Sequence, residues 1–187
     1  MSNEPIRLNT NQLRGYAPRL TAGDRVLLSG VIYTARDAAH KRFFELLDAG
    51  KPLPFDVKDA VIYYAGPTPG LGDLPVGACG PTTSGRMDQY APRLLDSGLV
   101  AMIGKGDRDK RVVEAMIRNR AVYFAAVGGA GALVASAIRS AQVVDFPELG
   151  CESVKRMEVA DMPLTVAIDA AGGSLYESGP AQYRKTR

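Results

Sequence analysis

The amino-acid sequence predicts an α/β fold with mixed sheets, in which helices follow strands and a β-rich section closes the C-terminus. Short β-rich apolar runs are followed, four times along the chain, by segments with apolar residues at helical spacing. After residue 154 the pattern changes to short strand-like segments joined by turns. At 187 residues, of which 46% are hydrophobic, the chain fits one domain over residues 1–187.

Within this domain, residues 1–20 are expected to form a polar arm and residues 21–187 the body of the fold. Ile6 and Leu8 of the arm can pair at a sheet edge. The first strand is expected within residues 24–35, where β-branched and large apolar residues are frequent.

A helix is expected to follow this first strand directly. Thr34 and Asp37 form the S/T-x-x-acid pattern that starts helices. Ala39 and Phe43 recur at helical spacing after it, and Gly50 is a typical stop.

A second strand is expected within residues 59–66, followed by a turn-rich loop over residues 66–75. Residues 76–83 resemble a strand end. They lead into a helix that Ser84 caps and Gly98 ends.

Two further units repeat the pattern. Residues 99–106 predict a strand, followed by a helix that Asp107 or Asp109 caps. Residues 121–141 predict another strand and helix, and residues 154–177 predict short strands without a helix.

Composition and charge argue against several classes of protein. A formal net charge of +3 without a basic stripe predicts no nucleic-acid partner. No segment approaches the roughly 20 apolar residues of a membrane span, and the N-terminus does not resemble a signal peptide, so we expect a cytoplasmic protein. Cys79, Cys151 and His40 are too few for a complete zinc site or a cysteine-held iron–sulfur cluster, so no metal is expected on this chain.

Three strand-to-helix junctions carry a cation, namely Arg36, Arg86 and Lys105. In open α/β sheets, ligands bind beyond the carboxyl ends of strands, where helix N-termini expose unpaired N–H groups. An arginine can clamp a carboxylate with two hydrogen bonds, and a lysine supplies a mobile point charge. The three cations therefore predict a site for a small ligand with two carboxylates.

The segment "GPTTSGRM" at residues 80–87 adds oxygen-binding groups to this prediction. Its glycines allow close backbone approach, and the hydroxyls of Thr82 and Thr83 can donate and accept hydrogen bonds. The order of residues is not that of a nucleotide-binding P-loop, because arginine and methionine stand where that motif has lysine and a hydroxyl.

Together, "GPTTSGRMD", "ARDAAH", "GKG", "GGAGALVA" and the "ELG" that contains Glu148 resemble the β subunit, or C-terminal half, of iron–sulfur hydro-lyases. This family includes class I fumarase and L-tartrate dehydratase, and the resemblance extends from about Thr21 to Glu177. It implies a swivelling β/β/α domain that works with an α subunit, whose three cysteines would hold a 4Fe–4S cluster. A homodimer or a heterotetramer is expected.

The resemblance also implies roles for individual residues. Arg36, Thr82, Thr83, Arg86 and Lys105 fall on the family's substrate-contacting positions. The threonine pair would move the proton together with an aspartate of the α subunit, and which threonine touches the proton stays open.

The activity implied is the reversible hydration of fumarate to (S)-malate, with the β subunit active only beside its partner. The alternatives are the β subunit of an L-tartrate dehydratase or a mesaconate hydratase, and a non-catalytic module that binds a dicarboxylate or phosphate. Two roles stay open: Asp88 is expected to cap a helix or orient Arg86, and His40 to be structural or to support the site from behind Arg36.

Overall fold

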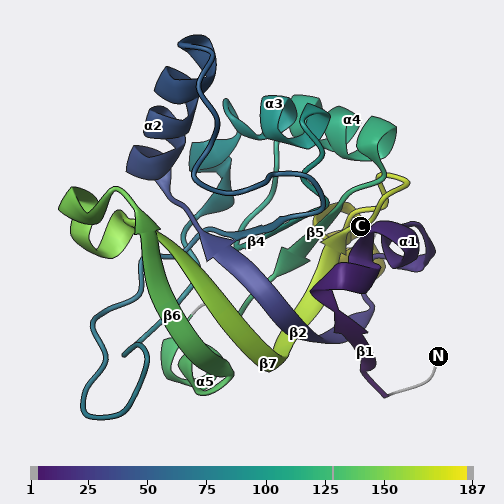
Figure 1. Ribbon diagram of the computed structural model, residues 1–187. Helices are drawn as coiled ribbons and strands as arrows, with labels where there is room; N and C mark the ends of the chain where they lie inside the picture. The colour runs from purple at the N-terminus through teal and green to yellow at the C-terminus, as the bar shows by residue number, and fades with distance from the viewer. Residues whose placement is uncertain (1–3, 128, 185–187) are drawn as a thin grey trace.

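The computed structural model describes residues 4–127 and 129–184. Its strands form a mixed sheet in the order β1-β2-β3-β4-β5-β7-β6, and β2 also pairs with β7. Through that pairing, β2, β3, β4, β5 and β7 close into a barrel, which β1 and β6 extend on the outside (Figure 1). The strands are β1 Ile6–Asn9, β2 Arg25–Thr34, β3 Val61–Tyr63, β4 Ala101–Gly104, β5 Val122–Ala125, β6 Ile138–Asp145 and β7 Val154–Ile168.

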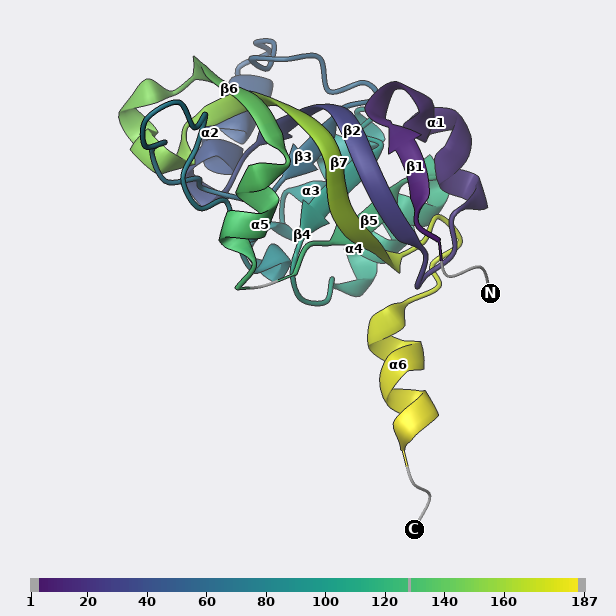
Figure 2. The same cartoon turned by 90° about the horizontal axis from the view of Figure 1, so that it is seen from below.

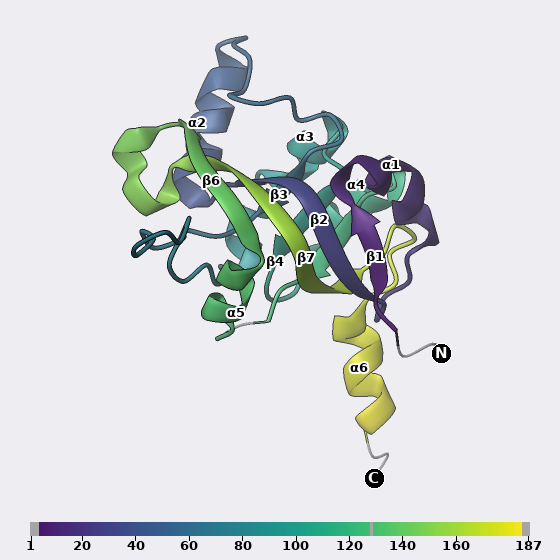
Figure 3. The same ribbon diagram turned by 60° about the horizontal axis from the view of Figure 1, so that its bottom comes forward.

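The sheet combines parallel and antiparallel pairs, as the sequence predicts. The strands β1 to β5 pair in parallel along the order of the sheet, and β7 runs antiparallel to β2, β5 and β6. Figure 3 shows β6, β7, β2 and β1 side by side on one wall of the barrel. Since β2, β3, β4 and β5 are parallel, their carboxyl ends meet at one edge.

Alternation along the strands divides the apolar side chains between two cores. In β3, Val61 and Tyr63 face the barrel interior, whereas Ile62 packs on the outer core. In β5, Val122 and Phe124 point inward and Tyr123 outward. This is the two-residue period of a strand that is buried on both faces.

Helices cover the outer core. Residues of α2, α3 and α4 pack there against β3, β4 and β5, and in Figure 1 α3 and α4 lie side by side with α2 further to the left. In Figure 2, α6 projects from the body near the C-terminus. The α-helices are α1 Leu13–Tyr16, α2 Asp37–Asp48, α3 Ala91–Asp96, α4 Lys110–Asn119, α5 Gly131–Ser136 and α6 Leu175–Tyr183, and the 3-10 helices are η1 Thr10–Gln12, η2 Ala17–Arg19, η3 Ser84–Met87 and η4 Pro147–Glu152. No described helix is long and apolar enough to cross a membrane.

Two of the predicted helix caps are wrong. Thr34 ends β2, and its hydroxyl accepts from Lys155 N at 3.1 Å, so α2 begins at Asp37 without it. Ser84 lies inside η3 and hydrogen-bonds Tyr123 instead of capping. Asp109 caps α4 as predicted, since its carboxylate accepts from Val112 N at 3.0 Å.

Several predicted boundaries also differ. Residues 76–83 form no strand, only isolated bridges such as Ala65 to Pro81. In 121–141 the helix ends at Ser136, and the chain turns into β6; Gly128 lies outside the described residues. The predicted short C-terminal strands are one 15-residue strand, β7. Residues 154–177 are expected to contain no helix, but α6 begins at Leu175, and Ser174 caps it by accepting from Tyr176 N.

The N-terminal residues are part of the fold. Ile6 pairs with Val26 and Leu8 with Leu28, which confirms the predicted edge pairing. Beyond this strand, Leu13 is buried in the barrel core, so the segment expected to be a polar arm contributes apolar packing.

Gly104 marks the closest approach between β4 and the "GPTTSGRM" segment. A Cβ atom at this position would lie 2.0 Å from Ser84 Oγ and 3.0 Å from Tyr64 Cδ2. We expect Gly104→Ala to lower the free energy of unfolding by about 2 kcal/mol or more, measured by urea denaturation. Gly15→Ala in α1, where no atom lies within 4 Å of the added Cβ, is the matched control and is expected to cause no loss. Equal losses in the two variants would contradict this tight contact.

Candidate active site

The predicted site residues lie at the carboxyl edge of β2, β3 and β4. Arg36 follows β2 and occupies the N-cap position of α2. The "GPTTSGRM" segment returns to the end of β3, where Thr82 N donates to Tyr64 O at 2.6 Å. Lys105 follows β4 directly.

Backbone hydrogen bonds hold the threonine pair against Lys105. Ser84 N donates to Lys105 O at 2.8 Å, and Lys105 N donates to Thr82 O at 3.3 Å. Thr83 and Lys105 form a parallel bridge. The backbones of Thr82, Thr83 and Lys105 are therefore neighbours, although more than twenty residues separate the threonine pair from the lysine in sequence.

Arg86 joins this group to the start of α2 through Asp37. The Nε atom of Arg86 donates to Asp37 Oδ1 at 2.9 Å. Among the described residues, no acceptor engages the terminal nitrogens of Arg86, and its side chain is 53% exposed. The two terminal NH2 groups of Arg86 are therefore free to bind a carboxylate.

Arg36 directly precedes Asp37 in the chain and pairs with a different carboxylate. Its guanidinium is 3.4 Å from Glu152 Oε1, a carboxylate that also accepts from Ala38 N at the start of α2. Arg36 Nε and Asp37 Oδ2 are buried without a hydrogen-bond partner in the described part of the chain. Buried polar atoms normally have hydrogen-bond partners, so these two unpaired atoms indicate that a ligand or a partner chain binds at this edge.

Asp88 does not have the predicted role. Its carboxylate bonds Arg108 Nε at 2.6 Å and Asp109 N at 2.7 Å, and the partner of Arg86 is Asp37 instead. The sequence does not predict Asp37, Glu152 or Arg108 as residues of the site, and Asp37 is expected there only as part of a helix start. Asp37 adjoins Arg36 in the quoted "ARDAAH" segment, but its contact with Arg86 crosses 49 residues.

His40 is a buried residue of the outer core. Its Nδ1 lies 2.9 Å from Arg36 O, so this nitrogen carries the proton and donates to the carbonyl. The rings of Phe43, Tyr64 and Tyr90 surround it at centroid distances of 5.5–5.7 Å. Burial lowers the pKa of His40 to about 4, which keeps the ring neutral at pH 7. This supports the structural role that the sequence left open for it.

The low pKa of His40 predicts a loss of stability in mild acid. In the unfolded chain the ring takes up a proton near pH 6.5, whereas in the folded chain it does so only near pH 4. The stabilising contribution is complete above pH 6.5 and is lost as the pH falls toward 4. We expect the free energy of unfolding to be about 2 kcal/mol lower at pH 5 than at pH 7.5, measured by urea denaturation. His40→Gln, which cannot titrate, is expected to remove most of this difference; an unchanged pH dependence in that variant would contradict the assignment.

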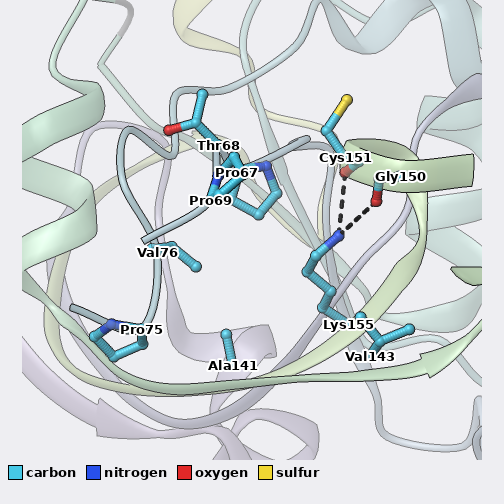
Figure 4. Close-up of a pocket in the computed structure, with 10 residues that line it drawn as sticks. All are labelled: Pro67, Thr68, Pro69, Pro75, Val76, Ala141, Val143, Gly150, Cys151 and Lys155. Carbon is cyan, nitrogen blue, oxygen red and sulfur yellow. Dashed lines mark hydrogen bonds between the residues drawn. The ribbon is translucent and has the colours of Figure 1, made fainter. Parts of the chain in front are cut away.

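A cavity of about 370 Å³ lies outside this edge, between the loop after β3, β6 and η4 (Figure 4). Prolines and valines make up half of its ten lining residues, and the one cation among the ten is Lys155. Lys155 Nζ donates to Gly150 O at 3.1 Å, Cys151 O at 3.3 Å and Ser153 Oγ at 2.6 Å. These bonds use the three N–H groups of the ammonium, so the cavity does not have the free cations that a dicarboxylate requires.

The residues of this chain do not fit a 4Fe–4S cluster. Burial raises the pKa of the Cys79 thiol to about 12, whereas a cluster ligand is a thiolate. Cys151 is exposed, and the two cysteines of the sequence are fewer than a cluster requires. Across residues 4–127 and 129–184, no group of three or more His, Cys, Asp or Glu side chains could hold a metal ion.

Cations and hydroxyls at the carboxyl ends of parallel strands are the arrangement with which α/β domains bind small anions. The chain belongs to the family described as Fumarase C-terminus, whose profile matches residues 1–179.

Individual proteins that are similar to this chain have names consistent with this family. The "Fumarate hydratase class I, anaerobic" of Escherichia coli strain K12 is 37% identical over 94% of this chain and 32% of its own length. The "Fumarate hydratase 1, mitochondrial" of Leishmania major is 40% identical over 82% of this chain and 28% of its own. The chain therefore spans about a third of the length of these relatives. The "Putative L(+)-tartrate dehydratase subunit beta" of Methanocaldococcus jannaschii is 40% identical over 85% of both chains.

Proposed function

We propose that the chain is the β subunit of a class I fumarate hydratase and hydrates fumarate reversibly to (S)-malate together with an α subunit. The observation that carries the proposal is the meeting of Arg36, Thr82, Thr83, Arg86 and Lys105 at one sheet edge of a fumarase-family chain. The proposed site consists of these five residues.

The cations of this chain would bind the dicarboxylate. Asp37 holds Arg86 by its Nε, so the two terminal nitrogens of Arg86 can meet a carboxylate side by side. When (S)-malate is dehydrated, a proton leaves the carbon next to a carboxylate, and negative charge spreads onto that group. Arg36, Arg86 and Lys105 would stabilise this charge.

The threonine pair would take part in moving the proton. A hydroxyl is a poor base alone, so Thr82 and Thr83 need an aspartate of the α subunit to accept the proton finally. Thr82 is half-buried and Thr83 is exposed. The role of base is proposed for the pair.

The remaining parts of the proposal concern assembly. The 4Fe–4S cluster would be held by three cysteines of the α subunit and act as a Lewis acid. Residues 21–187 would form a swivelling β/β/α domain that closes on that subunit, in a homodimer or heterotetramer. The cytoplasmic location expected from the sequence stays a prediction.

A second candidate is the β subunit of an L-tartrate dehydratase. It is favoured by the match to the Methanocaldococcus jannaschii protein, which is of similar length to this chain. The same cations would bind tartrate, and the pocket would differ by the space for a second hydroxyl. A mesaconate hydratase would need space for a methyl group.

The test is anaerobic reconstitution of the chain with the cluster-bearing subunit, iron and sulfide, followed by assays on (S)-malate, fumarate, tartrate and mesaconate. We expect the highest kcat/KM on fumarate and (S)-malate. A higher value on tartrate would assign the second candidate. No turnover on any of the four, with a dicarboxylate still bound, would indicate the non-catalytic binding module.

A further inference from the structure

Behind the threonine pair lies a buried ion pair that the proposed reaction does not use. The Arg108 side chain is fully buried and Asp88 is 9% exposed, with Arg108 Nε donating to Asp88 Oδ1 at 2.6 Å. The guanidinium carbon lies 5.3 Å from the Tyr64 ring centroid and 5.0 Å from that of Tyr123. Asp88 Oδ2 accepts from Asp109 N at 2.7 Å, so one carboxylate engages two positions of the chain after β4.

A hydroxyl chain makes a second connection between the same segments. Tyr123 donates its proton to Gly106 O at 2.8 Å. Because a phenol has one proton, Ser84 Oγ, which is 2.8 Å away, must be the donor to Tyr123. Burial raises the pKa of Tyr123 and keeps this proton in place.

The two connections join the segments that carry the proposed substrate groups. Residues 82–88 carry the threonine pair and Arg86, and residues 105–109 begin with Lys105. The backbone bridge between Thr83 and Lys105 lies at the start of both segments, and Asp88 and Arg108 lie near their ends. Each segment is therefore fixed to the other at both ends.

A buried ion pair contributes little net stability to a fold. Removing two charges from water is costly, and well-packed apolar residues in place of such a pair are often as stable or more so. Here the carboxylate and the guanidinium fix a geometry that apolar side chains cannot, because their hydrogen bonds have direction.

We propose that Asp88 and Arg108 are positioning residues that set the distance between Arg86 and Lys105 in the dicarboxylate site. This inference rests on the proposed function for its catalytic consequence, whereas the fixing of the two segments does not depend on it. Neither residue touches substrate in this account.

The test compares four forms of the assembled enzyme: wild type, the double variant Asp88→Leu/Arg108→Met, the single variant Arg108→Lys, and the core variant Met116→Ala in α4. The double variant removes both charges, so it avoids an unpaired buried ion and is expected to fold. We expect its KM for (S)-malate to rise and its kcat/KM to fall by about 10-fold to 100-fold. Arg108→Lys, which keeps the charge, should recover part of the loss. Met116→Ala should lower the melting temperature without changing KM.

Amide hydrogen exchange gives a readout that does not need the reaction. We expect exchange at Ser84 N and Lys105 N to become at least about 10-fold faster in the double variant and to stay unchanged in Met116→Ala. Unchanged KM and unchanged exchange in a folded double variant would overturn the positioning role. A wild type without turnover, with faster exchange in the double variant, would overturn the proposed function and leave the fixing of the segments standing.

Discussion

The chain without its partner is expected to show no hydratase activity, and turnover is expected to appear when the cluster-bearing subunit is added. The physical reason lies in the site. In the proposed site Arg36, Arg86 and Lys105 would bind the carboxylates, but the hydroxyls proposed to move the proton belong to Thr82 and Thr83, which are weak bases alone. Fumarate formation from (S)-malate, followed anaerobically by absorbance, measures the difference.

The control for this prediction is the partner subunit assayed alone under the same conditions. It is expected to be inactive as well, because the carboxylate-binding cations would be missing. Measurable turnover by the purified, metal-free chain would contradict the division of the site between two subunits. Full activity of the partner alone would show that this edge of the sheet takes no part in the reaction.

Arg86→Ala is expected to lower kcat/KM of the assembled enzyme by about 10²- to 10³-fold, the range typical for removing one stabilising donor at a reacting carboxylate. Arg86→Lys is expected to recover little, because a lysine cannot keep the bond to Asp37 and also offer two parallel donors. Steady-state kinetics on (S)-malate measure both variants.

Arg93→Ala is the matched control for Arg86→Ala. The two arginines are similarly exposed, at 45% and 53%, and each pairs with one aspartate of α2. Arg93 pairs with Asp48 at the C-terminal end of the helix, whereas Arg86 pairs with Asp37 at the N-terminal end. Loss of an exposed pair costs little stability, so Arg93→Ala is expected to stay within about 2-fold of wild type. Equal losses in both variants would mean that the site lies elsewhere.

Sequence patterns predict the parallel part of the fold well. Short apolar runs bounded by turn residues, such as residues 61–63 and 101–104, favour buried strands, and helical periodicity follows residues 101–104 in α4. The caps at Thr34 and Ser84 are wrong because each hydroxyl has a tertiary partner, Lys155 N and Tyr123 OH. Local pattern carries no information about those partners.

The C-terminal part is predicted less well for a similar reason. β7 stays one strand past Asp161 because β2 supplies hydrogen bonds along almost its whole length, with one irregularity opposite Leu28 and Gly30. Around Asp161 the local sequence favours a turn, but pairing with the distant strand β2 keeps the segment extended.

In the candidate site, too, the features set by local sequence are predictable and those set by tertiary contacts are not. Three cations at strand-to-helix junctions are visible in the sequence, because parallel topology brings such junctions to one edge. The carboxylate partners are not visible in the sequence. Asp37 reaches Arg86 across 49 residues, and Asp88 reaches Arg108, which is not one of the three cations, across 20. Acidic residues near helix starts are common, and only the fold selects the ones that meet an arginine.

The most direct measurement is a crystal structure of the assembled enzyme with (S)-malate bound under anaerobic conditions. The account predicts one carboxylate within hydrogen-bond distance of the terminal nitrogens of Arg86, with Lys105 and Arg36 close to the ligand and the threonine pair facing the carbon that loses its proton. A ligand bound away from Arg86 and Lys105 would contradict the account.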